Sequence, residues 1–256
     1  MKKLILLASL GLSISVCGQF KQIVSKLPTS LSGTSTKSVS NSENVAGLKN
    51  SLTVGIEKAV ANLGAENGFY KNEALKLLLP PEAQPIIKNI KMVPGGQDLV
   101  DKTVLAMNRT AEDAVKEAAP IFKTAITNMS VTDAVGILFG NNNAATEYLR
   151  KTTYSQLKAA FAPKVKASLD KPLVANASTT TTWNTLSSGY NKVAKTTAGS
   201  IYGMKTVNVD MENYVTEKAL DALFIKVADE EKSIRSNPSA RVNDLLKKVF
   251  GQLDKK

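Results

Sequence analysis

The stretch from Asp210 to Leu253 constrains the fold more than any other part of this chain, because helical apolar spacing and helix caps occur together in it. Its first residue is a favoured N-cap, and apolar residues then recur at the steps of three and four that give a helix one buried face. The charged run Asp229-Glu230-Glu231-Lys232 is predicted to end this first helix as a polar turn. A second helix is predicted to start at Pro238, with Asn237 as its cap and Gly251 at its C-terminal end. The side chains expected in the core are Tyr214, Val215, Ala219, Ala222, Leu223, Phe224, Ile225 and Val227 from the first helix, and Leu245, Leu246, Val249 and Phe250 from the second.

Helical spacing also runs through most of the chain before that stretch. One helix is predicted from about Asn44 to Gly64, and another from Ala144 to Leu169 with a bend before Pro163. Residues 176–203 are rich in threonine and serine, so this segment is predicted to be a marginal helix in a surface excursion. No segment shows strict two-residue alternation, the pattern of a half-buried strand. The sequence therefore predicts an all-α fold, a multi-helix globular bundle of about eight to ten helices, in a single domain over residues 44–256.

The first residues predict export. Two lysines precede an apolar run from Leu4 to Val16, which is too short to span a bilayer and is typical of a secretory signal. Cleavage after Gly18 would make residues 1–18 a signal peptide, and the Ser/Thr-rich residues 19–43 a flexible tether. The alternative is a lipoprotein that is anchored to the membrane through Cys17. The predicted location is the periplasm, and membrane association is expected only if Cys17 is lipidated.

Two missing residue types narrow the possible chemistry. The chain contains no histidine, and Cys17 is its one cysteine. Their absence from the expected mature protein excludes Ser-His-Asp and Cys-His nucleophile systems and also thiolate or imidazole metal sites. We therefore assign no catalytic residue, no metal ligand and no cofactor from the sequence, and an enzyme is less expected than a binding protein.

The charge of the chain is strongly basic. The formal net charge is +11 over the whole sequence. The lysines are spread along the chain, without the cluster and interleaved aromatic residues that a nucleic-acid surface needs. We expect a solvated basic surface and no nucleic-acid partner.

Five blocks of the sequence resemble one protein family. These blocks are GLKNSLTVGIEKAV from Gly47, MNRTAEDAV from Met107, APIFKTAI from Ala119, AATEYLRKTT from Ala144, and YVTEKALDALF…ADEEKSIRSNPSARVNDLLKKVFG from Tyr214. They resemble the Domain of Unknown Function 4197 family of exported bacterial proteins. The resemblance implies a helical fold and export, and it implies no activity.

Arginine is scarce, and its positions predict where polar contacts matter. Only four of the 33 basic residues are arginine, and all four lie in the family-like blocks. A guanidinium is preferred over an ammonium where a carboxylate is held by two bonds or where the charge is partly buried. One interpretation is a cluster that binds an anionic ligand, and the favoured alternative is a set of salt bridges between helices. The candidate residues are Arg109, Arg150, Arg235 and Arg241, with Glu217 and Asp221 as candidate carboxylates one helical turn apart.

Phe69 and Tyr70 are the apolar candidates for a ligand site. They follow Gly68 in a predicted loop, where they could form the gate or anchor of a cavity between helices. The alternative, a plain role in the core, is favoured for both residues.

These observations predict a non-enzymatic envelope protein. Its partner would be an apolar ligand such as a lipid, an anionic ligand, or another envelope protein. The alternative function is a carboxylate-dependent hydrolase acting on envelope glycans, which would need two carboxyl groups across a cleft. The sequence specifies neither the ligand nor the oligomeric state.

Overall fold

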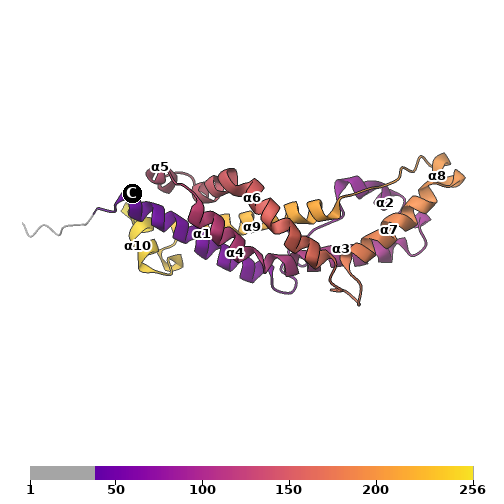
Figure 1. The fold of residues 1–256 in the computed structure, drawn as a ribbon, viewed down its shortest axis with the longest axis horizontal. Coiled ribbons are helices and arrows are strands. Elements are labelled where there is room, and N and C mark those ends of the chain that lie inside the picture. Colours follow the sequence, from indigo (N-terminus) through magenta and orange to yellow (C-terminus); the bar gives the residue numbers. More distant parts are fainter. Residues whose placement is uncertain (1–37, 256) are drawn as a thin grey trace, which may run out of the picture. The chain divides into compact units, whose positions relative to one another are not determined.

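A computed structural model describes residues 38–255, which fold into ten α-helices and four short 3₁₀-helices with no β-strand (Figure 1). The predicted all-α fold is therefore confirmed. Among these residues, β-type backbone pairing is limited to one isolated antiparallel bridge between Val174 and Ala177. The α-helices are α1 (Asn41–Leu63), α2 (Gln84–Lys88), α3 (Gly96–Val115), α4 (Ala118–Asn128), α5 (Ala134–Leu138), α6 (Ala144–Leu169), α7 (Thr179–Ala194), α8 (Thr197–Ile201), α9 (Met211–Ser236) and α10 (Asp244–Phe250). The 3₁₀-helices are η1 (Pro81–Ala83), η2 (Ile90–Met92), η3 (Pro238–Ala240) and η4 (Gly251–Lys255).

The first helix begins three residues earlier than predicted. Ser40 caps α1 by accepting a hydrogen bond from the Glu43 N–H at 3.2 Å, and Glu43 accepts in return from the Ser40 N–H at 2.9 Å. This capping box satisfies two backbone donors that the start of a helix would otherwise leave free. Residues 41–43 therefore belong to the helix and not to the predicted tether. The remaining tether residues up to 37, the predicted signal peptide and Cys17 lie outside the described residues.

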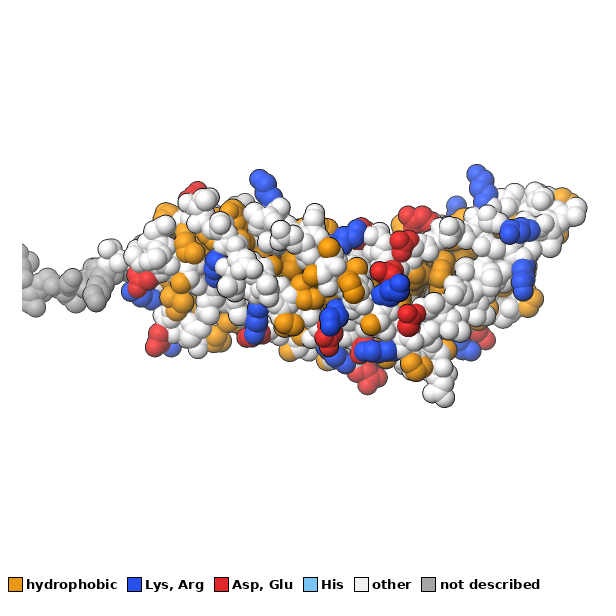
Figure 2. Space-filling view, in the orientation of Figure 1, with side chains coloured by type: hydrophobic (Ala, Val, Ile, Leu, Met, Phe, Trp, Pro, Cys, Tyr) orange, Lys and Arg blue, Asp and Glu red, His pale blue; other side chains and the backbone are white. Residues whose placement is uncertain are grey.

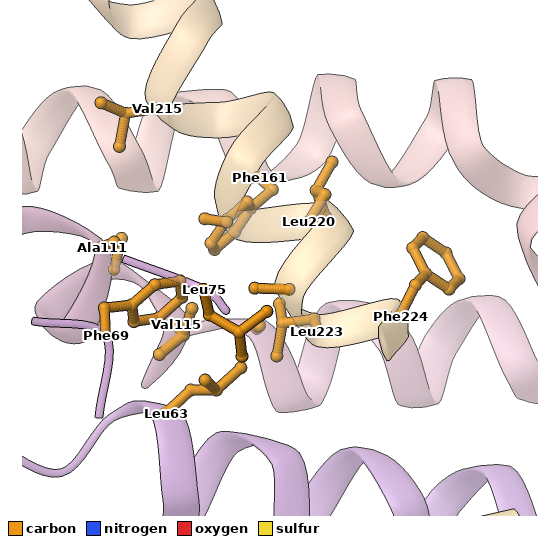
Figure 3. Packing of buried hydrophobic residues seen from close by; sticks show 14 of the residues in the cluster. Leu63, Phe69, Leu75, Ala111, Val115, Phe161, Val215, Leu220, Leu223 and Phe224 are labelled. Carbon is orange, nitrogen blue, oxygen red and sulfur yellow. The ribbon is translucent and has the colours of Figure 1, made fainter. Parts of the chain in front are cut away.

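Helix α9 is the central element of the compact unit that begins at Val39. Helices α1 and α6 pack along it, and α3, η3 and α10 also contact it. Figure 3 shows Leu220 and Leu223 of α9 among Leu63, Phe69 and Phe161 from other parts of the chain. Because α9 supplies buried residues along its whole length, it links the packing of these helices into one core.

The predicted polar turn at 229–232 is wrong, because α9 continues through it to Ser236. Asp229, Glu230 and Glu231 each have a cationic partner, so their charges do not require the helix to end there. Asn237 does cap a helix, as predicted, because its side chain accepts a hydrogen bond from the Ser239 N–H. However, Pro238 opens only the short η3, and α10 begins at Asp244 after its own cap, Asn243.

Most of the predicted core of this region is confirmed. Val215, Ala219, Ala222, Leu223, Phe224 and Val227 of α9 are buried, together with Leu246, Val249 and Phe250 of α10. Tyr214 and Leu245 are half-buried against this core. Ile225 is the exception, since 47% of it is exposed. It lies on the outer face of α9, one helical step beyond the buried stripe.

Two further predictions are corrected elsewhere in the chain. Helix α6 is unbroken, with Pro163 inside it and no interruption before the proline. Segment 176–203 contains α7, capped by Ser178, and this helix packs against α3. Trp183, Leu186 and Tyr190 of α7 are buried, so the helix belongs to the body and is not a surface excursion. Tertiary packing has overridden the weak helix propensity of its threonines.

None of the helices described for residues 38–255 has the length and apolar character needed to cross a membrane.

The contact between α1 and α10 gives a test of the packing. A methyl group at Gly47 would lie 2.6 Å from a Val249 methyl carbon, so the two helices approach as closely as glycine allows. We expect Gly47→Ala to lower the free energy of unfolding by about 1–3 kcal/mol through overpacking. Gly189→Ala in α7 is the matched control, because nothing lies within 4 Å of its new methyl group. That change should be neutral or stabilising by up to about 1 kcal/mol. Urea unfolding of both variants measures the difference, and equal effects would contradict the close approach.

Candidate ligand-binding groove

The eight residues predicted from the sequence fall into three separate clusters. Arg109 lies with Phe69 and Tyr70, Arg150 lies with Asp221, and Arg235 lies with Arg241. Glu217 lies beside the second cluster on α9. No hydrogen bond or ion pair found within residues 38–255 joins one cluster to another. The structure therefore does not bring the four arginines to one cleft.

The first cluster fixes a loop. Glu112 of α3 is buried and its Oε1 accepts hydrogen bonds from the backbone N–H groups of Phe69 and Tyr70, both at 3.1 Å. Arg109 Nη1 pairs with the other oxygen of Glu112 at 2.5 Å, and Arg109 Nη2 donates to Asn67 Oδ1 at 3.0 Å. The Phe69 ring is fully buried, and Figure 3 shows it close to Val115 and Leu75. Phe69 therefore has the core role that the sequence analysis favoured, and the Arg109 guanidinium is engaged in holding the loop.

The second cluster joins α6 to α9. Arg150 pairs with Asp221 at 2.5 Å, and its guanidinium lies 5.3 Å from the ring centres of both Tyr154 and Phe224. Lys158 of α6 pairs with Glu217 at 2.6 Å. A hydrogen bond from the Lys158 ammonium holds the pKa of the Glu217 carboxyl below its usual range. Both candidate carboxylates therefore have a cationic partner on α6.

The third cluster is buried and polar. Arg235 donates to Glu231 Oε1 at 2.8 Å and to the backbone oxygens of Leu138 and Ile137 at the end of α5. Glu231 accepts in turn from the N–H groups of Ala145 and Thr146 at the start of α6, at 2.9 and 2.7 Å. One ion pair thus satisfies carbonyls at the end of one helix and amides at the beginning of the next.

Arg241 closes the C-terminal end of α9. Its guanidinium donates to the backbone oxygens of Ile234 and Arg235 at 2.9 and 3.1 Å, and it binds both oxygens of Asp254 at 2.5 and 2.7 Å. This hydrogen bonding lowers the pKa of the Asp254 carboxyl. All four arginines therefore pair with carboxylates, but only the Arg150–Asp221 ion pair joins two α-helices, so the expected set of salt bridges between helices is found in part. The partner of Arg241 is one that the sequence did not indicate.

The structure also contains a groove that the sequence did not predict. The groove measures about 360 Å³ and lies between the non-helical segment 74–78 and the outer face of α9. We call it the α9 groove. Its volume is within the range of small-molecule sites, roughly 300–1,000 Å³. Besides that segment, the lining residues are Tyr214, Lys218, Asp221, Ala222 and Ile225.

The wall of the α9 groove is held in place by side chains from two helices. Asn108 of α3, which is fully buried, accepts from the Leu77 N–H at 2.9 Å and donates to the Leu77 carbonyl oxygen at 2.8 Å. The Tyr214 hydroxyl donates to the carbonyl oxygen of Leu78 at 2.9 Å. A segment fixed in this way does not have to be ordered when a ligand binds, which reduces the entropic cost of binding.

The α9 groove combines apolar surface with positive charge. Leu78 and Ile225 are 61% and 47% exposed and supply its apolar surface. Lys76 and Lys218 lie over the rings of Tyr70 and Tyr214, at 4.3 and 5.9 Å from the ring centres. Neither lysine is in an ion pair within the described part of the chain, whereas the Asp221 carboxylate is neutralised by Arg150. The groove therefore offers two ammonium groups beside an apolar floor.

Two other hollows are less suited to a charged ligand of this kind. A pocket of about 320 Å³ between α4 and α6 is lined by uncharged residues, including Ile121, Ala125 and Leu157. A larger cavity of about 570 Å³ beside α7 contains the carboxylates Asp170, Asp210 and Glu212. In the described residues, no three carboxylate or other metal-ligating side chains come together as a metal site.

The arginine contacts give a test that distinguishes buried from exposed pairs. Arg241→Lys should lower the free energy of unfolding by about 1–3 kcal/mol, because an ammonium cannot make the four hydrogen bonds of the buried guanidinium. Arg150→Lys is the control, since its guanidinium is 39% exposed and makes one short contact, and we expect a loss below about 1 kcal/mol. Chemical denaturation of both variants measures these losses. A loss at Arg241 no greater than at Arg150 would contradict the structural role.

Comparison with known proteins identifies one family. The family model described as "Protein of unknown function (DUF4197)" matches residues 38–251, which is most of the chain. No curated protein and no solved structure matches the chain. The match begins just before α1 and ends at the glycine that follows α10, so it covers all ten α-helices described for residues 38–255. This chain belongs to the DUF4197 family.

Proposed function

We propose that this chain is an exported, non-enzymatic envelope protein that binds an anionic amphiphile in the α9 groove. The ligand class is an apolar chain that ends in a carboxylate or phosphate group. One observation carries the proposal, namely the exposed Leu78 and Ile225 beside two lysines that have no carboxylate partner in the described residues. The apolar part of the ligand would cover Leu78, Ile225 and Ala222, and its anionic group would lie at Lys76 and Lys218.

Export is supported by the sequence alone. The lysines and apolar run at the N-terminus are typical of a secretory signal, and they lie outside the described residues. A periplasmic protein encounters lipids and their fatty-acid products, which are ligands of the chemistry proposed for the groove.

The alternative function, a carboxylate-dependent glycan hydrolase, has weaker support. Glu217 and Asp221 are each held by a cation, at 2.6 and 2.5 Å. In the larger cavity beside α7, Asp170 accepts a hydrogen bond from Thr180 and Asp210 caps α9. These carboxylates already have structural partners, so the binding proposal is favoured.

Laurate, a fatty-acid anion with a saturated chain, is a direct probe of the proposal. We expect isothermal titration calorimetry to show one laurate bound per chain and no binding of acetate, which lacks the apolar part. Ile225→Asp should raise the dissociation constant for laurate at least about tenfold, since a charge would face the alkyl chain and tenfold corresponds to about 1.4 kcal/mol. Lys76→Glu combined with Lys218→Glu should weaken binding to a similar extent. Lipids extracted from the purified protein and identified by mass spectrometry would show the natural ligand.

Matched controls use exposed residues outside the groove. Ile201→Asp replaces an isoleucine that is 77% exposed, and Lys151→Glu combined with Lys232→Glu reverses two exposed lysines. These variants should bind laurate as the native chain does. Equal affinities of the groove variants and the controls, with helical content unchanged, would overturn the groove as the site.

A further inference from the structure

The turn after α8 exposes two large apolar side chains at neighbouring positions. Ile201 is 77% exposed and Tyr202 is 70% exposed, the two highest values for large hydrophobic residues in the described chain. Gly203 follows with a φ of 65°, a left-handed conformation that lets the chain reverse towards α9. We call Ile201, Tyr202 and Gly203 the α8 tip.

The α8 tip is held outward by the packing beneath it. The Thr196 side chain caps α8 by accepting from the Gly199 N–H at 3.1 Å, and the Met204 N–H donates to the Gly199 carbonyl oxygen at 2.9 Å. Met204 and Val207 are buried, and Asn191 of α7 bonds the backbone of Val207 through both its oxygen and its nitrogen. The core positions near the turn are therefore already filled, so Ile201 and Tyr202 remain outside.

The segment around the tip carries positive charge only. Between Lys171 and Val209 the sequence contains no aspartate or glutamate. Lys192, Lys195 and Lys205 are exposed, and within the part of the chain that the structure describes none of them is in an ion pair. Figure 2 shows lysine side chains projecting from the region that α7 and α8 occupy in Figure 1, with the acidic side chains lying mainly over other helices.

We propose that the α8 tip inserts into the interface of an anionic lipid bilayer. An aliphatic side chain and a tyrosine at a turn suit the boundary between headgroups and acyl chains, where the tyrosine hydroxyl stays hydrated. Lysines within a Debye length of the surface add electrostatic attraction, about fivefold in affinity for each one. Two exposed side chains are too few for a stable protein interface, which buries about 800 Å² on each partner. The complementary charge and this small apolar tip therefore favour a membrane surface as the occupant, independently of the α9 groove.

Vesicle sedimentation with the full chain tests the proposal. We expect binding to vesicles that contain phosphatidylglycerol mixed with phosphatidylcholine, and little binding to vesicles of phosphatidylcholine alone. Raising the salt concentration to about 0.5 M should weaken binding, because screening shortens the range of the lysine charges. Ile201→Ser combined with Tyr202→Ser should lower the partition coefficient at least about tenfold. Lys192→Gln, Lys195→Gln and Lys205→Gln together should lower it about a hundredfold.

The controls remove the same chemistry from other surfaces. Val242→Ser replaces another exposed apolar residue, and Lys151→Gln, Lys232→Gln and Lys247→Gln together remove the same number of charges. Both should sediment with the vesicles nearly as the native chain does. Every variant keeps the same N-terminal residues, so binding through those residues alone would leave the tip variants equal to the native chain. That equality, or equal binding to both vesicle compositions, would overturn the proposal, and neither result depends on laurate binding in the groove.

Discussion

The buried ion pair between Glu231 and Arg235 is the interaction on which the packing around α9 depends. The two side chains are 0% and 3% exposed, and the closest nitrogen–oxygen distance between them is 2.7 Å. Removing two charges from water is costly, and the attraction between them compensates only when the remaining hydrogen-bonding groups are also satisfied. That condition is met here, because Glu231 accepts from the start of α6 and Arg235 donates to the end of α5. The Arg235 guanidinium also lies 5.7 Å from the Phe250 ring centre, which connects the pair to α10.

Whether a charged side chain has partners also distinguishes the residues that stabilise the fold from those that could bind a ligand. Two buried carboxylates, Glu112 and Glu231, fix a loop and a helix start, and the more exposed Asp254 binds the arginine that closes the end of α9. Lys76 and Lys218 in the α9 groove and the lysines near the α8 tip are among the exposed or half-buried charges that have no ion-pair partner in the described chain. Both outer sites combine aliphatic surface with positive charge, and both proposals therefore point to anionic lipid chemistry.

The fold could be predicted from the sequence because periodicity and caps are local signals. The predicted caps Asp210 and Asn237 accept hydrogen bonds with their own side chains, and the buried positions of α9 recur at helical spacing. The errors arose where distant residues decide the local structure. Asp229 to Glu231 form a polar run that would end a helix in isolation, but partners on α1, α6 and α9 itself absorb their charges. The candidate groove was missed for a similar reason, since Ile225 follows the buried stripe by one residue and Asn108 positions Leu77 across 31 residues of sequence.

The free energy of unfolding of Glu231→Gln tests the central claim most directly. Replacing the carboxylate leaves Arg235 buried without its counter-charge and presents an amide N–H₂ group to the donors at the start of α6, so we predict a loss of about 3–5 kcal/mol in urea unfolding. Glu230→Gln is the neighbouring control. Glu230 pairs with Lys58 at 2.7 Å on a partly exposed face, and its replacement should change stability by less than about 1 kcal/mol. A loss for Glu231→Gln no larger than that for Glu230→Gln would show that the buried pair does not organise the fold.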